Sequence, residues 1–302
     1  MDTYIIQIFN GISVSSIFIL AALGLGITFG LMKVINMAHG EFIMIGAYVT
    51  FLLHNLFAAQ LPAFFDTYFF FAIPAAFIVA GMMGLILEQT VIKHLYGRPL
   101  DSMLATWGVS LILQQLARSI FGAPNVDVRS PAWLNGGLII QGLQFPYKRL
   151  FIIGLVIVCL AGIFWLLFKT TTGRRIRAVM QNRDMAAGLG INARKIDAYT
   201  FAIGSGFAGV AGCALSLIGS IGPTLGTAYI VDTFMVVVLG GVGTLWGIVA
   251  GGLVIGTANT TFEFFTNTSW GKVLVFLLVI LFLQWKPKGL FTIHSRSLDE
   301  QG

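Results

Sequence analysis

The chain has 302 residues, of which 57% are apolar and only 10% are charged, with a mean hydropathy of +0.89 and a formal net charge of +6. A typical soluble domain is about 25% charged, so the composition excludes an ordinary soluble protein and indicates a polytopic membrane protein. The basic residues lie beside apolar runs, which is the usual bias of cytosolic loops, and we expect no nucleic-acid partner.

The apolar runs predict an all-α fold in a single transmembrane domain that covers residues 1–302. Only helices and closed barrels satisfy their backbones in lipid, and these runs are too long and continuous for barrel strands. We expect full spans at about 9–32, 40–57, 69–92, 101–121, 150–169, 197–219 and 271–285. With one broken region, this makes about 7–8 transmembrane helices.

The broken region covers residues 231–265, which are apolar but too many for one simple helix. Gly240, Gly241 and Gly243 interrupt it. We predict a re-entrant pair of half-helices that meet at these glycines, with two full crossings as the alternative.

Lysines and arginines orient the spans, because positive charge is enriched on the cytosolic side. The markers of that side are Lys33, Lys93, Arg98, the stretch 169–195, Lys286, Lys288 and Arg296. The connections at 58–68 and 122–148 are poor in basic residues and should face outward. The N-terminus is therefore predicted outside and the C-terminus inside. The N-terminus also lacks a basic n-region, so the first apolar run should stay in the mature protein.

The most polar stretch is the loop at 170–196, with the sequence TGRRIRAVMQNRDMAAGLGIN at residues 172–192. Each arginine in hydrocarbon costs several kcal/mol, so this stretch must lie outside the membrane core. One helix would place Ile176, Val179, Met180 and Ala187 on one stripe, opposite Arg174, Arg177, Gln181 and Asp184. Such a helix suits an anionic lipid surface or a groove on a partner protein, and the break at Gly188–Gly190 favours the partner.

Polar residues inside apolar runs mark a candidate solute path. Asn36, His39 and Glu41 can simply start a helix, but ionisable groups within a membrane are also functional candidates. Asp232 is ambiguous in the same way. The path candidates are Asn36, His39, Glu41, Asp232, Gly240, Gly241, Gly243 and Trp246.

Glycines recur at four-residue spacing at Gly26 and Gly30 and again at Gly243, Gly247 and Gly251. This spacing lets two helix backbones approach closely, either in tight packing or in a seam that slides or lines a pore. The segments 24–46 and 240–256 also echo each other, as the two halves of transporters built from inverted repeats do.

Enzyme motifs are absent from the sequence. It contains no GxxxxGK[ST] phosphate loop and no HExxH or CxxC metal pattern, and Cys159 and Cys213 lie inside apolar runs as packing residues. We therefore expect no catalytic residues, no metal site and no enzymatic activity.

Several motifs in order resemble the branched-chain amino-acid family of ABC importer permeases, over about residues 8–292. They are GLMKVINMAHGEFIMIGAY, RAVMQNRDMAAGLGI, VVVLGGVGTLWG and KPKGLF. Within that family, MQNRDMAAGLG, IGSIGPTLGTAYIVDTFMVVVLGGVGTLWG and LFLQWKPKGLF look most like the urea-type permease subunit.

The resemblance implies a multi-pass protein of the cytoplasmic (inner) membrane of a prokaryote. Its partners would be a homologous second permease, two cytosolic ATPases and a periplasmic or lipid-anchored binding protein. ATP and Mg would bind the ATPases, and this chain would hold no cofactor. The residues that match the family's ATPase-coupling loop are Arg177, Met185, Ala186, Ala187, Gly188 and Gly190. The other arginines are expected to fix orientation and contact lipid.

The expected function is therefore urea import by alternating access. Within the same family, the alternatives are a branched-chain amino acid or a short-chain amide as substrate. From other classes, an ATP-independent small-solute channel would leave the basic loop without a purpose. A secondary transporter would need an ion-coupling carboxylate, for which Glu41 and Asp232 are the candidates.

Overall fold

The structure is a computed structural model that describes residues 2–32, 34–140 and 142–291. Two of the predicted cytosolic markers, Lys33 and Arg296, lie outside these residues. The elements run in the order α1 Asp2–Met32, α2 His39–Gln60, η1 Pro62–Thr67, α3 Tyr68–Thr90, η2 Ile92–His94, α4 Pro99–Phe121, η3 Ala132–Leu134, β1 Gly137–Ile140, β2 Leu143–Pro146, α5 Tyr147–Lys169, α6 Thr171–Gln181, α7 Arg183–Gly188, α8 Ala193–Leu215, α9 Leu225–Gly240, α10 Leu245–Phe265 and α11 Thr268–Trp285.

The fold is an all-α membrane bundle, as predicted. Among the described residues, seven helical stretches are long and apolar enough to cross a membrane: α1, α2, the stretch Pro62–His94 that contains α3, α5, α8, α10 and α11. The fourth predicted span forms a 23-residue helix, α4. It is not among the seven, and its sequence includes Asp101, Gln114, Gln115 and Arg118.

Two helices, α1 and α8, begin earlier than the predicted spans, and polar side chains anchor or cap their first turns. α1 begins at Asp2, well before the apolar run, and Gln7 Nε2 donates to Thr260 O at 2.5 Å, which anchors this extension to α10. α8 begins at Ala193 because Asn192 Oδ1 accepts from Lys195 N at 3.1 Å and caps the helix.

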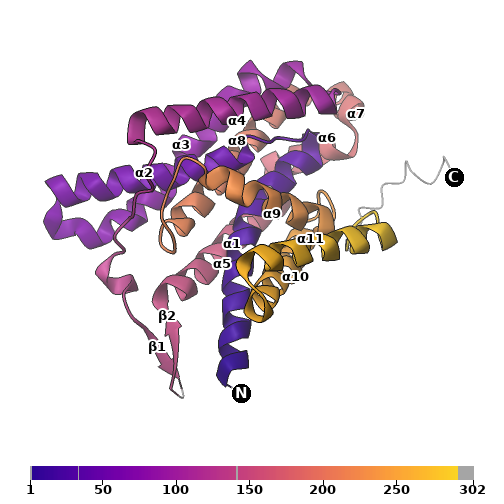
Figure 1. Cartoon of the computed structure of the whole chain (residues 1–302). Coiled ribbons are helices and arrows are strands. Elements are labelled where there is room, and N and C mark those ends of the chain that lie inside the picture. The colour runs from indigo at the N-terminus through magenta and orange to yellow at the C-terminus, as the bar shows by residue number, and fades with distance from the viewer. Residues whose placement is uncertain (1, 33, 141, 292–302) are drawn as a thin grey trace.

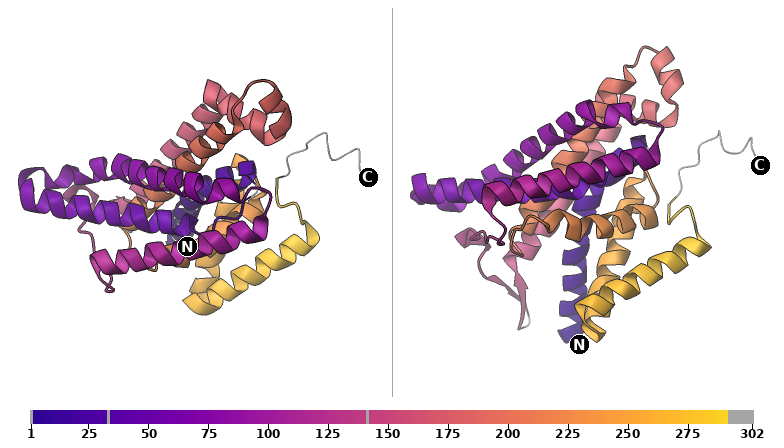
Figure 2. Two further views of the ribbon diagram at one scale, coloured as in Figure 1. Left: turned by 90° about the horizontal axis from the view of Figure 1, so that it is seen from above. Right: turned by 45° about the horizontal axis from the view of Figure 1, so that its top comes forward.

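The centre of the bundle is α8, which packs against α1, α2 and α3. In Figure 1, α1 stands upright while α2, α3 and α4 run across it. Seen from above in Figure 2, α2 and α3 extend side by side away from the α10–α11 pair. The helices approach so closely because α8 is rich in small residues. A Cβ added to Gly204 would lie 2.7 Å from Gly24 O, and one added to Gly212 would lie 2.8 Å from Ala47 N.

The glycine-rich region is broken where predicted, into two helices of 16 and 21 residues, α9 and α10. α9 ends at Gly240, and Gly241 and Gly243 take positive φ values of 101° and 83° in the turn to α10. α10 has 21 residues, enough to cross a membrane. It runs antiparallel to α1, with Gly243 beside Gly30 and Gly256 beside Ser15.

α9, with 16 residues, is apolar but shorter than the seven stretches that could cross a membrane, so two crossings stay a prediction beside the re-entrant pair. The glycine turn lies at an end of the bundle, where Leu290 N donates to Leu239 O at 2.8 Å and Phe291 N to Gly240 O at 3.0 Å. Gly241 and Gly243 form the turn, whereas the glycines within α10 pack against neighbouring helices. The spacing of glycines in the sequence does not distinguish these two roles.

The predicted cytosolic markers that the structure describes gather at one end of the bundle, which we call the basic end. A side chain at Gly30, near the end of α1, would meet both Gly243 and Met180 of α6. The Arg183 guanidinium lies over the ring of Tyr96, a residue of the connection between η2 and α4. At the opposite end, Phe9 of α1 contacts Phe145 of the β1–β2 hairpin. The alternation of ends agrees with the alternation predicted from charge.

Candidate functional site

The basic loop folds into two short helices and not into the single amphipathic helix predicted. Thr170 Oγ1 accepts from Gly173 N at 3.0 Å and caps α6, and Asn182 Oδ1 accepts from Met185 N at 2.9 Å and caps α7. Asn182 itself has an extended backbone, with φ −155° and ψ 108°, so it ends α6 and starts α7. Gly190, with φ +81°, terminates the segment.

The turn at Asn182 changes which residues of the loop face inward. Ile176 and Val179 of the predicted apolar stripe are buried, but Ala187 of that stripe is exposed and Ala186 is buried instead. Met185 is 66% exposed and Leu189 is 78% exposed, although both are apolar. The exposed residues of this turn form what we call the α7 surface: Met185, Ala187, Gly188, Leu189 and Gly190.

The arginines of the loop play different parts. Arg174 and Arg175 are exposed on α6, as expected of residues that contact lipid headgroups or solvent. Arg177 is half-buried, bonds to Leu167 O and lies 4.9 Å from the centre of the Phe168 ring. It therefore fastens α6 to the end of α5, away from the α7 surface.

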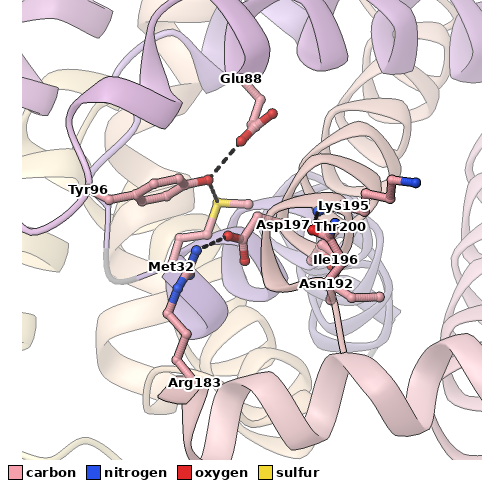
Figure 3. A network of polar contacts seen from close by, with 9 residues as sticks. All are labelled: Met32, Glu88, Tyr96, Arg183, Asn192, Lys195, Ile196, Asp197 and Thr200. Atoms are coloured by element: carbon pink, nitrogen blue, oxygen red, sulfur yellow. Dashed lines mark hydrogen bonds and ion pairs between the residues drawn. The ribbon is translucent and has the colours of Figure 1, made fainter. Parts of the chain in front are cut away.

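Arg183 points into the bundle and is the centre of a polar network (Figure 3). Its Nη2 donates to Asp197 Oδ2 of α8 at 2.5 Å, and its guanidinium lies 5.1 Å from the centre of the Tyr96 ring. Tyr96 Oη donates to Glu88 Oε1 of α3 at 2.9 Å and approaches Met32 Sδ of α1 at 3.8 Å. Burial, with the nearby Asp197 and Glu88 carboxyl groups, raises the pKa of Tyr96 above its ordinary value, so it remains a neutral donor.

The polar residues at the start of α2 are buried but point to different neighbours. His39 Nε2 lies 3.1 Å from Ala21 O of α1, whereas Glu41 Oε1 accepts from Ser110 Oγ and Gln114 Nε2 of α4, both at 2.9 Å. Asn36 Oδ1 accepts from Ala38 N at 3.0 Å and shapes the turn before the helix. Asn36 Nδ2, His39 Nδ1 and Glu41 Oε2 are buried with no hydrogen-bond partner among the described residues.

Asp232 lies in a separate place, beside a cavity of about 360 Å³ between α1, α9, α10 and α11. Its Oδ2 is 3.6 Å from Lys272 Nζ of α11. Asn259 Nδ2 donates to Glu263 Oε1 at 3.1 Å, and Arg149 also lines the cavity. The structure thus brings Asp232 together with charged residues of the last two helices, and not with Glu41.

The remaining path candidates are at the glycine turn. Gly240 packs against Gly247, and Gly241 packs against the backbone of Phe291. Trp246 is 70% exposed at the start of α10. These residues shape the end of the bundle and line neither the Asp232 cavity nor the Glu41 cluster.

A family model described as "Branched-chain amino acid transport system / permease component" matches residues 7–283. The chain belongs to this permease family. It is 29% identical to the high-affinity branched-chain amino acid transport system permease protein BraD of Pseudomonas aeruginosa, over 95% of each chain. It is 31% identical to the corresponding protein LivH of Salmonella typhimurium, over 94% of each chain.

A more distant relative is the permease protein LivM of Escherichia coli, which is 26% identical over 95% of this chain and 70% of LivM. No solved structure matches the chain. Family membership and the seven apolar stretches make this permease a multi-pass protein of the cytoplasmic membrane of a prokaryote.

Two residues of this permease that matter for its geometry were not among the predicted site residues. Lys272 is a single lysine within the last apolar span, and a charge in such a place is itself a signal. Asp197 stands two residues after Lys195, and its burial gives no mark in the sequence. The partner of Arg183 is a tertiary contact that local patterns do not contain.

Proposed function

We propose that this permease is one of two homologous membrane subunits of an ABC importer and that a cytosolic ATPase docks on its α7 surface. The observation that carries the proposal is the exposed apolar turn from Met185 to Leu189, which lies at the basic end on a short helix. An exposed apolar patch outside the membrane core is typical of an interface with another protein. In this reading the ATPases bind ATP and Mg, and the permease itself does no bond chemistry.

The arrangement of the helices supports transport by alternating access. α7 leads directly into α8, and α8 is the central helix against which α1, α2 and α3 pack. The closest approaches between these helices are made at glycines, where backbones meet without interlocking side chains. A displacement of α7 can therefore shift α8 relative to its neighbours.

A branched-chain amino acid is the leading candidate for the substrate, because the named relatives are permeases for branched-chain amino acids. The cavity beside Asp232 fits a zwitterion. It is lined by two acidic side chains, Asp232 and Glu263, and two basic ones, Arg149 and Lys272, whose formal charges sum to zero. Its volume of about 360 Å³ is within the usual range for small-molecule sites.

Urea is the second candidate, and the motifs MQNRDMAAGLG and LFLQWKPKGLF favour it because they resemble the urea-type subunit. Urea is neutral and presents one carbonyl acceptor and four N–H donor bonds. Polar groups in the same cavity, among them Asn259 and Ser13, could exchange hydrogen bonds with it.

Uptake by the reconstituted importer tests the function. The complete complex, with both permeases, the ATPases and the binding protein, is placed in proteoliposomes and supplied with labelled leucine or labelled urea, with and without ATP. We expect one of the two solutes to accumulate only with ATP. Accumulation of leucine alone supports the first candidate and of urea alone the second. Equal uptake without ATP would indicate a channel and overturn the proposal.

A further inference from the structure

The polar network at the start of α7 connects side chains of α7, α8, α3 and α1 and of the segment between η2 and α4. The Arg183 side chain touches Asp197 of α8 and the Tyr96 ring, which stands between η2 and α4. Tyr96 continues the contact to Glu88 of α3 and Met32 of α1. Figure 3 shows these side chains converging from separate elements on the space beside Arg183.

The exposure of the two charged partners is unequal. The Arg183 side chain is 40% exposed, whereas that of Asp197 is fully buried. Removing Arg183 would leave a buried carboxylate without its counter-charge, which is strongly unfavourable. The other Asp197 oxygen, Oδ1, is buried without a hydrogen-bond partner among the described residues, so a single N–H···O bond joins the two groups.

A single bond has a mechanical consequence. A bidentate pair fixes the relative orientation of two groups, whereas one bond lets them rotate about it while the distance is kept. α7 has only six residues, and Ala186 is its only buried member. Arg183 is thus the polar attachment of a short helix whose opposite face is exposed.

We propose that the Arg183–Asp197 pair is the joint that transmits displacement of α7 to α8, and through Tyr96 and Glu88 to α3. Both are positioning residues, since neither belongs to the exposed α7 surface or to the Asp232 cavity. The inference rests on the proposed function, because it needs an ATPase that moves α7. It assigns to Arg183 a role different from that of the exposed arginines of α6.

The test uses the complete importer in proteoliposomes and compares Arg183→Ala, Asp197→Ala and the exchange Arg183→Asp with Asp197→Arg. Three quantities are measured: co-purification of the ATPases, ATP hydrolysis stimulated by the loaded binding protein, and solute transported per ATP hydrolysed. The matched control is Arg175→Ala, which removes an exposed arginine from the same loop.

We expect both single variants to bind the ATPases at the wild-type level but to transport about tenfold less solute per ATP, a typical size for a coupling between sites. The exchanged pair should recover most of the loss, and Arg175→Ala should match the wild type. A merely structural role would lower yield and activity together and leave the transport per ATP unchanged.

A distance measurement keeps the inference testable if a variant assembles poorly. Spin labels at Leu189→Cys and Leu100→Cys, both exposed positions, report the position of α7 relative to α4 in the solubilised permease. Cys159 and Cys213 are first replaced by Ala. We expect a narrow distance distribution with Arg183 and a broad one with Arg183→Ala. An unchanged distribution together with unchanged transport per ATP overturns the inference, whereas a wild-type importer without ATP-driven uptake overturns the proposed function instead.

Discussion

At the scale of single residues, the partner of a charged side chain decides its role, and that partner is set by the tertiary fold. Four arginines stand within ten residues of one another in the basic loop. Two are exposed, Arg177 lies on Phe168, and Arg183 alone among them pairs with a carboxylate in the described structure. Helical spacing could not separate them, because the capping turn at Asn182 changes the helical phase between Arg177 and Arg183.

The glycines of α8 are tightly packed, and this gives a prediction for Gly212→Ala. The new Cβ would meet the backbone of Ile43 and lie 2.8 Å from Ala47 N, so α2 and α8 would have to separate. Overpacking of this kind costs about 1–3 kcal/mol. We expect a lower melting temperature of the purified permease. It is measured from the fraction of protein that remains in the monodisperse peak of size-exclusion chromatography after heating.

Gly162→Ala is the matched control for this experiment, because a Cβ at Gly162 has no heavy atom within 4 Å. Its melting temperature should equal or slightly exceed that of the wild type, since Ala favours a helix more than Gly does. Equal melting temperatures of the two variants would contradict close packing between α2 and α8.

At the scale of elements, the α7 surface gives a prediction for ATPase docking. Gly188→Glu adds a bulky charge to an exposed position where a Cβ meets nothing within 4 Å, so the fold should tolerate it. The charge would enter the proposed apolar interface and have to be desolvated. We expect co-purification of the ATPases to fall at least about tenfold, which corresponds to roughly 1.4 kcal/mol of binding free energy.

The control for docking is Gln181→Glu, which adds the same charge at an exposed position on α6. It should keep normal co-purification, and both variants should insert into the membrane at the wild-type level. Recovery of the ATPases at wild-type yield with Gly188→Glu would show that the α7 surface is not the docking site.

Sequence patterns predicted most of the long helices because an apolar run of about 20 residues has few other solutions in lipid. They did not predict the start of α9 at Leu225. The preceding residues 216–224 contain no charged side chain that would mark the boundary between two helices. They also placed Asn36, His39, Glu41 and Asp232 in one candidate path. In the structure, His39 faces α1 and Glu41 faces α4, because residues two apart point in different directions around one helix. Asp232 stands on another helix, α9, and faces α11.

At the scale of the whole molecule, the basic end collects segments from all parts of the chain. The connection from α3 to α4, the helices α6 and α7, the α9–α10 turn and residues 286–291 after α11 all meet there. Positive charge is enriched on the cytosolic side of membrane proteins, so this end should face the cytosol. The β1–β2 hairpin at the opposite end should then face the periplasm.

This orientation predicts the labelling of three single-cysteine variants made after Cys159 and Cys213 are replaced by Ala. Ile139→Cys lies in the hairpin, Leu189→Cys on the α7 surface and Val242→Cys in the glycine turn, and all three positions are exposed. With a thiol reagent that does not cross the inner membrane, we expect Ile139→Cys to react in cells whose outer layer is permeable. Leu189→Cys and Val242→Cys should react only in inverted vesicles.

Val242→Cys is the informative member of the set, because the two arrangements of residues 231–265 place it differently. In a helical hairpin that crosses twice, Val242 is as accessible from the cytosolic side as Leu189. At the apex of a re-entrant pair it would lie within the membrane and react slowly from either side. Slow labelling of Val242→Cys beside rapid labelling of Leu189→Cys would therefore contradict the hairpin, and labelling from the periplasm would reverse the assigned orientation of α9 and α10.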